Sequence, residues 1–216
     1  NEEFKYYVLF CSFNALLVAL TIYFVSDSSF EKSFRDGLFQ VVSVVTTTGY
    51  VSADYTAWTP FLTVLFFVLM FFGASAGSTA GGVKIVRHVI LFKNSVLELK
   101  RQIHPSAVIP VRFNKKAITR DITFNILAFI MIYISVFGVG SVAISATGVD
   151  FMTAIGSVAT CLGNIGPGLG TVGPVDNFAH LPADAKWILS FLMLVGRLEL
   201  FTVLMLFTPY FWRKHS

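Results

Sequence analysis

Side chains that build catalytic or metal centres are scarce in this sequence. Its 216 residues include two cysteines and four histidines, and only 13% of them are charged. Cys11 and Cys161 are best interpreted as small apolar packing residues, and the histidines lack the spacing typical of a metal site. No nucleophile, general base or metal ligand set stands together, so a membrane enzyme is the weakest hypothesis and we expect no catalytic residue. No basic stretch is interleaved with aromatics, which argues against nucleic acid as a partner.

The low charge content also excludes a soluble protein. Hydrophobic residues make up 55% of the chain, including 23 Phe, as expected of a protein that has lipid as its solvent. Four stretches are long enough to cross about 30 Å of hydrocarbon. They are Phe4–Val25, Pro60–Phe72 with its continuation past the glycines, Ile122–Thr147 and Lys186–Tyr210. The first stretch is too long for a signal-peptide core and lacks a cleavage site, so we expect it to be retained.

The charges predict an orientation. Nine of the 16 Lys and Arg lie between Lys84 and Arg120, and two more are Arg213 and Lys214. By the positive-inside rule, the linker 84–120 and the C-terminus face the cytoplasm, and the basic face would suit anionic membrane lipids. Seven of the 12 acids fall on the other side, where they would concentrate cations: Asp27, Glu31, Asp36, Asp54, Asp150, Asp176 and Asp184.

A short motif occurs twice, 117 residues apart. The run Val45-Thr-Thr-Thr-Gly-Tyr50 and the run Leu162-Gly-Asn-Ile-Gly-Pro167 each follow an apolar segment of about twelve residues, 34–45 and 151–162. Twelve helical residues cross only half a membrane, so each segment predicts a helix that enters the membrane and returns as extended backbone lining a cavity. The C-terminal carbonyls of such a helix favour a cation over an anion.

The extended backbone after each short helix predicts an ion filter. Glycine adopts the conformations that turn successive carbonyls toward one axis, where they replace the water around an ion. We expect a cation to bind as the substrate, at these backbone carbonyls only, and we expect no covalently bound cofactor. Ordinary loop glycines are the alternative interpretation, which the duplication disfavours. The candidate filter residues are Thr47, Thr48, Gly49, Tyr50, Asn164, Ile165, Gly166 and Pro167.

A run of ten small residues interrupts the second span of the first repeat. Its four glycines would cost a helix on the order of 3–4 kcal/mol relative to alanine, which predicts local unwinding. The alternative is close helix packing through overlapping GxxxG motifs. A phosphate-binding loop is rejected because Val83 separates the last glycine from Lys84. The corresponding stretch of the second repeat is rich in leucine, so only one repeat is expected to be interrupted. The candidate gate residues are Gly73, Ala74, Ser75, Ala76, Gly77, Ser78, Thr79, Ala80, Gly81, Gly82, Lys84 and Arg197.

Arg197 is the one basic residue deep within a span. Glu199 is two positions away and therefore points to another face of the helix. Aligning Gly73 with Gly196 places Arg197 level with the run of small residues. A charge at this depth favours a position facing a cavity, and we expect Arg197 to hold loop carbonyls or to form an electrostatic barrier. A structural ion pair with a neighbouring span is the alternative.

These motifs, together with Gly166-Pro-Gly168 and Gly196-Arg197, resemble the C-terminal half of the Trk/Ktr/HKT cation transporters, in particular the TrkH-type bacterial potassium-uptake subunits. The resemblance implies four repeats around one pore, of which this chain supplies the third and fourth. It also implies an N-terminal half with two further repeats, a gating loop beneath the filter, a homodimer of full-length subunits and a cytosolic ring of nucleotide-binding regulatory subunits. The first residue is Asn rather than Met, consistent with a fragment.

We therefore expect an all-α integral membrane protein of two tandem membrane helix–pore helix–membrane helix repeats, which is half of a potassium-channel-like pore. The first repeat is expected over residues 1–101, a cytoplasmic linker over 102–117, where His104–Lys116 forms a loop, and the second repeat over 118–216. The predicted function is potassium uptake across the bacterial inner membrane. The alternatives are a Na+-permeable or non-selective cation transporter and a non-transporting assembly protein of the same fold.

Overall fold

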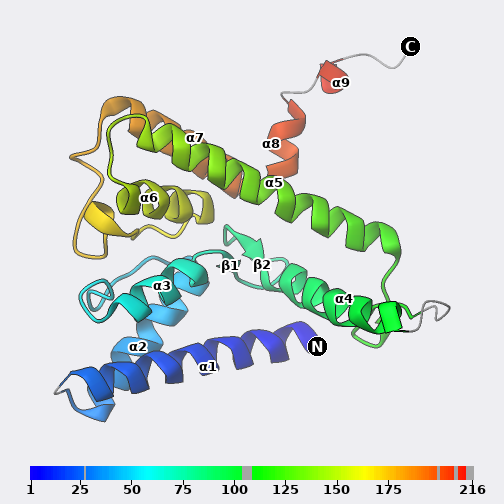
Figure 1. Ribbon diagram of the computed structural model, residues 1–216, viewed down its shortest axis with the longest axis horizontal. Helices are drawn as coiled ribbons and strands as arrows, with labels where there is room; N and C mark the ends of the chain where they lie inside the picture. The colour runs from blue at the N-terminus through cyan, green and yellow to red at the C-terminus, as the bar shows by residue number, and fades with distance from the viewer. Residues whose placement is uncertain (27, 104–108, 199, 207–208, 213–216) are drawn as a thin grey trace.

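The computed structural model describes residues 1–216 except 27, 104–108, 199, 207–208 and 213–216. Most described residues are helical, and they form two tandem units of helix, short helix and helix, which confirms the predicted fold (Figure 1). The first unit contains α1 (Glu2–Val25), α2 (Phe30–Val45), α3 (Pro60–Leu69), β1 (Phe72–Gly73), β2 (Val83–Lys84) and α4 (Ile85–Ile103). A hairpin of β3 (Arg112–Phe113) and β4 (Lys116–Ala117) precedes the second unit, which contains α5 (Arg120–Ser145), α6 (Phe151–Gly163), η1 (Gly170–Val172), α7 (Ala183–Arg197), α8 (Leu200–Leu206) and α9 (Pro209–Trp212).

Side-chain caps define where several helices begin. Asn1, Ser29, Thr59 and Asp150 each precede a helix and accept a hydrogen bond from a backbone amide of its first turn. Such caps satisfy amides that have no partner inside the helix. Pro60 occupies the first turn of α3, where its missing amide costs nothing. These local signals place α2 and α6 at nearly the predicted positions, although α2 begins at Phe30 rather than at residue 34.

Two apolar cores and a shared seam hold the units together. In the first core Val18 of α1, Val41 of α2 and Phe66 of α3 are fully buried, and the second core joins α5, α6 and α7. Ile165 and Leu169, which follow α6, pack into the first core and so join the two units. The cores therefore bring the segments after α2 and α6 together, between the long helices α1 and α5 (Figure 1).

Two of the four predicted spans are single helices. Among the described residues, only α1 and α5 are both long and apolar enough to cross a membrane alone. The span expected from Pro60 divides into α3 and α4, and residues 74–82 between them are not helical. The last span, expected as Lys186–Tyr210, is also divided, because α7 ends at Arg197 and α8 begins at Leu200.

The expectation that only one repeat is interrupted was therefore wrong. Leu198 leaves the α-helical conformation, with φ −87° and ψ 16°. The interruption follows Gly196, a weak helix former, and the guanidinium of Arg197 is bonded outside its own helix, to the Thr79 carbonyl. Glu199, which entered the argument about Arg197, lies outside the described residues.

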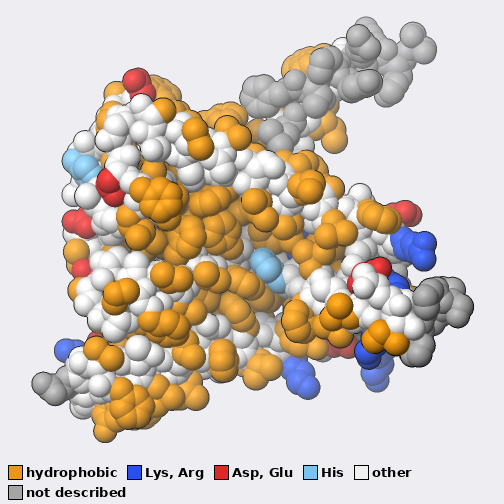
Figure 2. All heavy atoms as spheres, in the orientation of Figure 1, with side chains coloured by type: hydrophobic (Ala, Val, Ile, Leu, Met, Phe, Trp, Pro, Cys, Tyr) orange, Lys and Arg blue, Asp and Glu red, His pale blue; other side chains and the backbone are white. Residues whose placement is uncertain are grey.

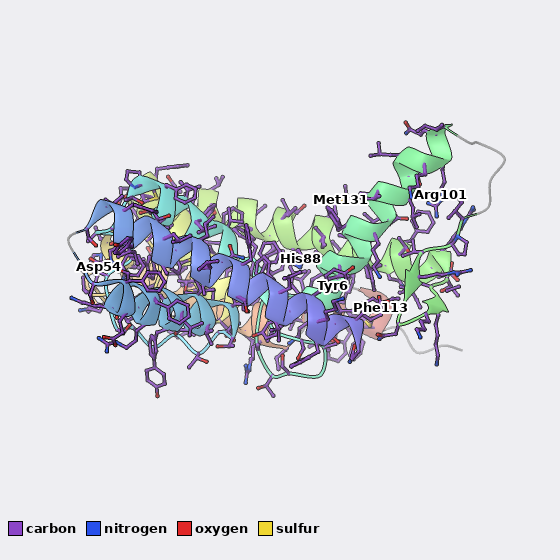
Figure 3. The ribbon with its side chains drawn as sticks, turned by 90° about the horizontal axis from the view of Figure 1, so that it is seen from below. Tyr6, Asp54, His88, Arg101, Phe113 and Met131 are labelled. Carbon is purple, nitrogen blue, oxygen red and sulfur yellow. The ribbon has the colours of Figure 1, made fainter. Side chains whose placement is uncertain are left out.

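The outer surface is apolar along the length of the long helices. Met131 and Val142 on α5 are 73% and 72% exposed, respectively, in a helix whose most apolar segment has a mean hydropathy of 2.3. Figure 2 shows apolar side chains over most of one face, with many of the visible basic side chains near α4. Asp54 and Arg101 lie at opposite ends of the molecule (Figure 3). Such a surface is typical of a protein surrounded by lipid.

The linker contains more structure than a loop. Residues 104–108, the first part of the expected loop His104–Lys116, lie outside the described residues. Arg112 and Phe113 pair in antiparallel register with Ala117 and Lys116. The two residues at the turn, Asn114 and Lys115, have φ 49° and 64°. Two consecutive left-handed residues match the tight turn that the twist of a hairpin requires.

Candidate ion filter and gate

The first candidate filter segment, residues 47–50, begins where α2 ends. Thr47 has φ 55° and Gly49 has φ 76°, so two of three successive residues have left-handed backbone. The amide of Thr47 donates to the Val44 carbonyl at 3.0 Å, and the amide of Thr48 donates to the Ser43 carbonyl at 2.9 Å. These bonds fold the segment back against the end of α2, as expected of a chain that enters the membrane and returns.

The second segment repeats this geometry 117 residues later. Asn164 has φ 54° and Gly166 has φ 125°, at the positions equivalent to Thr47 and Gly49. The amides of Asn164 and Ile165 donate to the carbonyls of Cys161 and Thr160 at 3.1 and 3.0 Å. The offset of 117 residues therefore relates backbone conformation and hydrogen bonds as well as sequence.

The two segments touch each other at Gly49. A Cβ atom built on Gly49 would lie 1.9 Å from the carbonyl oxygen of Ile165. At Gly166 the nearest atom to such a Cβ is 3.8 Å away, so its glycine is required by its φ alone. Gly49 thus meets two requirements, a left-handed backbone and the close approach of a neighbouring carbonyl.

Buried hydroxyl groups form hydrogen bonds with the backbone of both segments, and the sequence analysis missed them. Ser43 Oγ donates to the Tyr50 carbonyl at 2.6 Å, and Thr160 Oγ1 accepts from the Gly166 amide at 2.9 Å. Ser43 and Thr160 are 117 residues apart, so the repeat comparison contained the signal. Both side chains are buried, where an unpaired hydroxyl is costly.

The run of small residues forms a closed loop. Phe72 pairs with Val83 in parallel register and Gly73 pairs with Lys84, so the two ends of the loop are joined. Lys84 Nζ donates to the carbonyls of Ser78 and Ala80 at 2.8 and 2.6 Å. The sequence analysis grouped Lys84 with the loop, and the structure places its ammonium against the loop carbonyls.

Arg197 reaches the same loop from α7. Its guanidinium Nη1 donates to the carbonyl of Thr79. The structure thus shows one loop carbonyl bonded to Arg197, and the role of Arg197 in gating stays a prediction. Arg197, Ser78 and Lys84 are among the residues that line a cavity of about 180 Å³ beside the loop.

The loop packs directly against the end of α6. A Cβ on Gly81 would lie 2.3 Å from the Gly163 carbonyl oxygen, and a Cβ on Gly196 would lie 2.0 Å from that of Leu162. Asn164 Nδ2 donates to the Met193 carbonyl at 3.1 Å and links the filter segment to α7. Small residues therefore allow the loop, α7 and the filter segment to approach each other at backbone distance.

Glu3 is a second support of the loop that the sequence analysis missed. Its carboxylate accepts from the amide of Ala76, and it is only 9% exposed although it lies near the start of α1. Next to it, Glu2 forms an ion pair with Lys93 of α4 at 2.6 Å. These contacts join α1 to the loop and to α4 across more than 70 residues of sequence, a separation at which no local pattern indicates them.

Polar groups at the opposite end of α6 favour ionised carboxylates. Asp150 caps α6, and hydrogen bonds from Thr153 hold the pKa of its carboxyl below the ordinary value. Within the part of the chain that the structure describes, no group of three His, Cys, Asp or Glu could hold a metal ion.

Comparison with known proteins decides the family. Residues 8–214 match the family model described as TrkH, cation transport protein. The chain belongs to the TrkH family. It is 40% identical over 214 residues to "Trk system potassium uptake protein TrkH" of Halomonas elongata, covering 99% of this chain and 44% of that protein. The Escherichia coli K12 protein of the same name is 42% identical over 187 residues, covering 87% and 38% of the two chains.

A solved structure gives the same result for the fold. The crystal structure of the potassium transporter TrkH from Vibrio parahaemolyticus superimposes with a TM-score of 0.91 at 38% identity. The match covers 98% of this chain and 45% of that one. The chain thus spans less than half the length of the relatives that it matches, and it has the membrane-transporter fold with helix–pore helix–helix repeats.

Proposed function

We propose that this chain forms half of a potassium-uptake pore in the bacterial inner membrane. The two relatives described above are named potassium uptake proteins, and the chain spans 44% and 38% of their lengths. Two filter segments cannot surround an ion on four sides, so a preceding half with two further repeats completes the pore. Residues 1–101 and 118–216 are then the third and fourth repeats, and 102–117 the linker.

The observation that carries this proposal is the duplicated backbone at the two filter segments. Left-handed residues at Thr47 and Asn164, and at Gly49 and Gly166, turn the chain at equivalent points after two short helices. Carbonyl oxygens arranged in this way replace the hydration shell of K+. The C-terminal ends of α2 and α6 add partial negative charge, which favours a cation at the same place. K+ is the substrate and moves down its electrochemical gradient.

The loop of residues 73–82 is the proposed gate. It lies next to the end of α6, and Lys84 and Arg197 hold its carbonyls. Displacement of the loop would remove backbone from the path below the filter. The cationic groups that hold the loop would also oppose the passage of K+ until they move with it.

The orientation follows from the charges. The linker 84–120 and the C-terminus are proposed to face the cytoplasm, and Asp54 and Asp176 the outside. The linker is then accessible to a cytosolic nucleotide-binding ring, and its basic residues are accessible to anionic lipid headgroups. A homodimer of full-length subunits completes the proposed assembly.

Ion flux into liposomes tests the proposal. The complete assembly that contains this chain is reconstituted, and uptake of K+ and of Na+ is measured under the same gradient. Uptake of K+ well above that of Na+ is the expected result. Equal uptake of both ions favours the non-selective alternative, and no uptake of either, from correctly inserted protein, favours an assembly protein of the same fold.

A further inference from the structure

A buried tyrosine hydroxyl joins the two repeats just beyond the filter. Tyr55 follows Gly49 of the first filter segment by six residues, and its hydroxyl donates to the Gly168 carbonyl at 2.7 Å. Gly168 follows Gly166 of the second segment by two residues. The bond spans 113 residues of sequence, and both of its ends are buried.

Packing fixes the position of the Tyr55 hydroxyl. The side chain is 0% exposed, and its ring stacks on Phe66 of α3 with centroids 4.5 Å apart and planes at 19°. Trp58 also lies against the Phe66 ring, with centroids 6.0 Å apart and planes at 52°. A tyrosine held in this way has little rotamer freedom, so its hydroxyl defines one point in space.

The acceptor is equally constrained. The Gly168 amide donates to the Val172 carbonyl at 2.7 Å, and the next residue, Leu169, is 1% exposed in the core of the first repeat. A Cβ on Gly156 of α6 would lie 2.6 Å from the Leu169 amide nitrogen. The chain leaving the second filter segment is therefore held between α6 on one side and Tyr55 on the other.

We propose that Tyr55 is a positioning residue for ion selection: its hydrogen bond to Gly168 sets the spacing between two adjacent filter segments. The segments touch at Gly49 and Ile165, and the bond at Tyr55 fixes a second point farther along the chain. Two fixed points determine both the separation and the tilt of neighbouring strands, on which the distance from the carbonyls to the ion depends. This inference rests on the proposed function of the filter.

Tyr55→Phe is the direct test, because it removes the hydroxyl and keeps the ring. In the complete assembly in liposomes, the ratio of K+ to Na+ uptake should fall by about threefold or more, since a carbonyl that loses a buried partner moves to find another. Maximal K+ uptake per inserted molecule should stay within about twofold. A purely structural role would lower the amount of inserted protein and the uptake of both ions together.

Tyr7→Phe is the matched control. Tyr7 is a half-buried tyrosine on α1 that packs against the same apolar core and is far in sequence from either filter segment. Its ratio should equal that of the parent. A second variant, Phe66→Leu, keeps the Tyr55 hydroxyl but removes the ring that orients it, and it should lower the ratio in the same direction. It decides the question if Tyr55→Phe does not insert.

The outcomes separate the inference from the proposed function. A parent without preference for K+ would refute both. A selective parent whose ratio is unchanged in Tyr55→Phe would refute the inference alone, as would a fall of equal size in Tyr7→Phe. If Tyr55→Phe does not insert into the membrane, an unchanged ratio of K+ to Na+ uptake in Phe66→Leu would refute the inference instead.

Discussion

Replacement of Gly49 by alanine should damage ion selection more than any other single methyl group added to a filter glycine. The new Cβ would lie 1.9 Å from the Ile165 carbonyl oxygen, whereas ordinary van der Waals contact begins at 3.4 Å. The difference of 3.4 − 1.9 = 1.5 Å must come from movement of one filter segment against the other. The φ of 76° adds strain of about 1–2 kcal/mol for a residue with a Cβ.

The expected result is a loss of K+ preference by about tenfold or more, because each 1.4 kcal/mol of altered relative binding is a factor of ten. The assay is the ratio of K+ to Na+ uptake in liposomes, with the amount of inserted protein measured separately. Gly166→Ala, with φ 125° and no atom within 3.8 Å of its Cβ, should give a smaller loss.

Gly148→Ala is the matched control for backbone strain. Gly148 has φ 86° and open space around its Cβ position, and it lies after α5, away from the filter segments. The ratio of K+ to Na+ uptake in Gly148→Ala should equal that of the parent. If Gly49→Ala retains the selectivity of Gly148→Ala, the contact between Gly49 and Ile165 has no part in ion selection and the reasoning from geometry is wrong.

Three further predictions address the gate, the orientation and the helix cap. Arg197→Ala and shortening of the loop within 73–82 should each raise open probability, and in a double-mutant cycle their effects should be less than additive; additive effects would separate Arg197 from the gate. Cysteines replacing Lys116 and Asp176 should be labelled only from the cytoplasm and only from outside, respectively, and labelling from the same side would contradict the orientation. Asp150→Ala should lower stability by about 1 kcal/mol in thermal unfolding near neutral pH. The pKa of the Asp150 carboxyl is lower in the folded protein than in the unfolded chain, so the cap stabilises the fold above the unfolded-state pKa. This stabilisation is lost as the pH falls through the folded-state pKa. The difference in stability between Asp150→Ala and the parent should therefore vanish in acid.

The sequence predicted those parts of the fold that local signals determine. The two candidate filter glycines mark where the chain returns after each short helix. The start of α6 at Phe151 was predicted, whereas α2 begins at Phe30, after the cap at Ser29, rather than at residue 34. The ten small residues 73–82 include four glycines and have too little helix propensity to continue a span. In the structure they are not helical. The interruption after Arg197 was not predicted, because Leu198 and Leu200 are good helix formers and the single Gly196 is a weak signal.

The contacts that position the candidate site were harder to anticipate. Glu3 meets Ala76, and Tyr55 meets Gly168, across 73 and 113 residues. Such pairs depend on how whole helices pack, and no periodicity or motif in one sequence indicates them. The paired hydroxyls of Ser43 and Thr160 are an intermediate case, since the repeat alignment places them together without showing that they touch the filter. The proposed filter and gate residues themselves stay predictions until flux is measured.

The pairing of β1 with β2 has a mechanical consequence for the proposed gate. Because Phe72 and Val83 are already joined, the ends of α3 and α4 keep their separation whatever the residues between them do. If the loop is the gate, its tip would move as a separate part. The displacement would change the loop's contacts with Lys84, Arg197 and Glu3, while the surrounding helices would stay where the apolar cores hold them. Conduction through such a pore would be switched without changing the thickness or tilt of the protein in the bilayer, and its rate of switching should be insensitive to membrane tension.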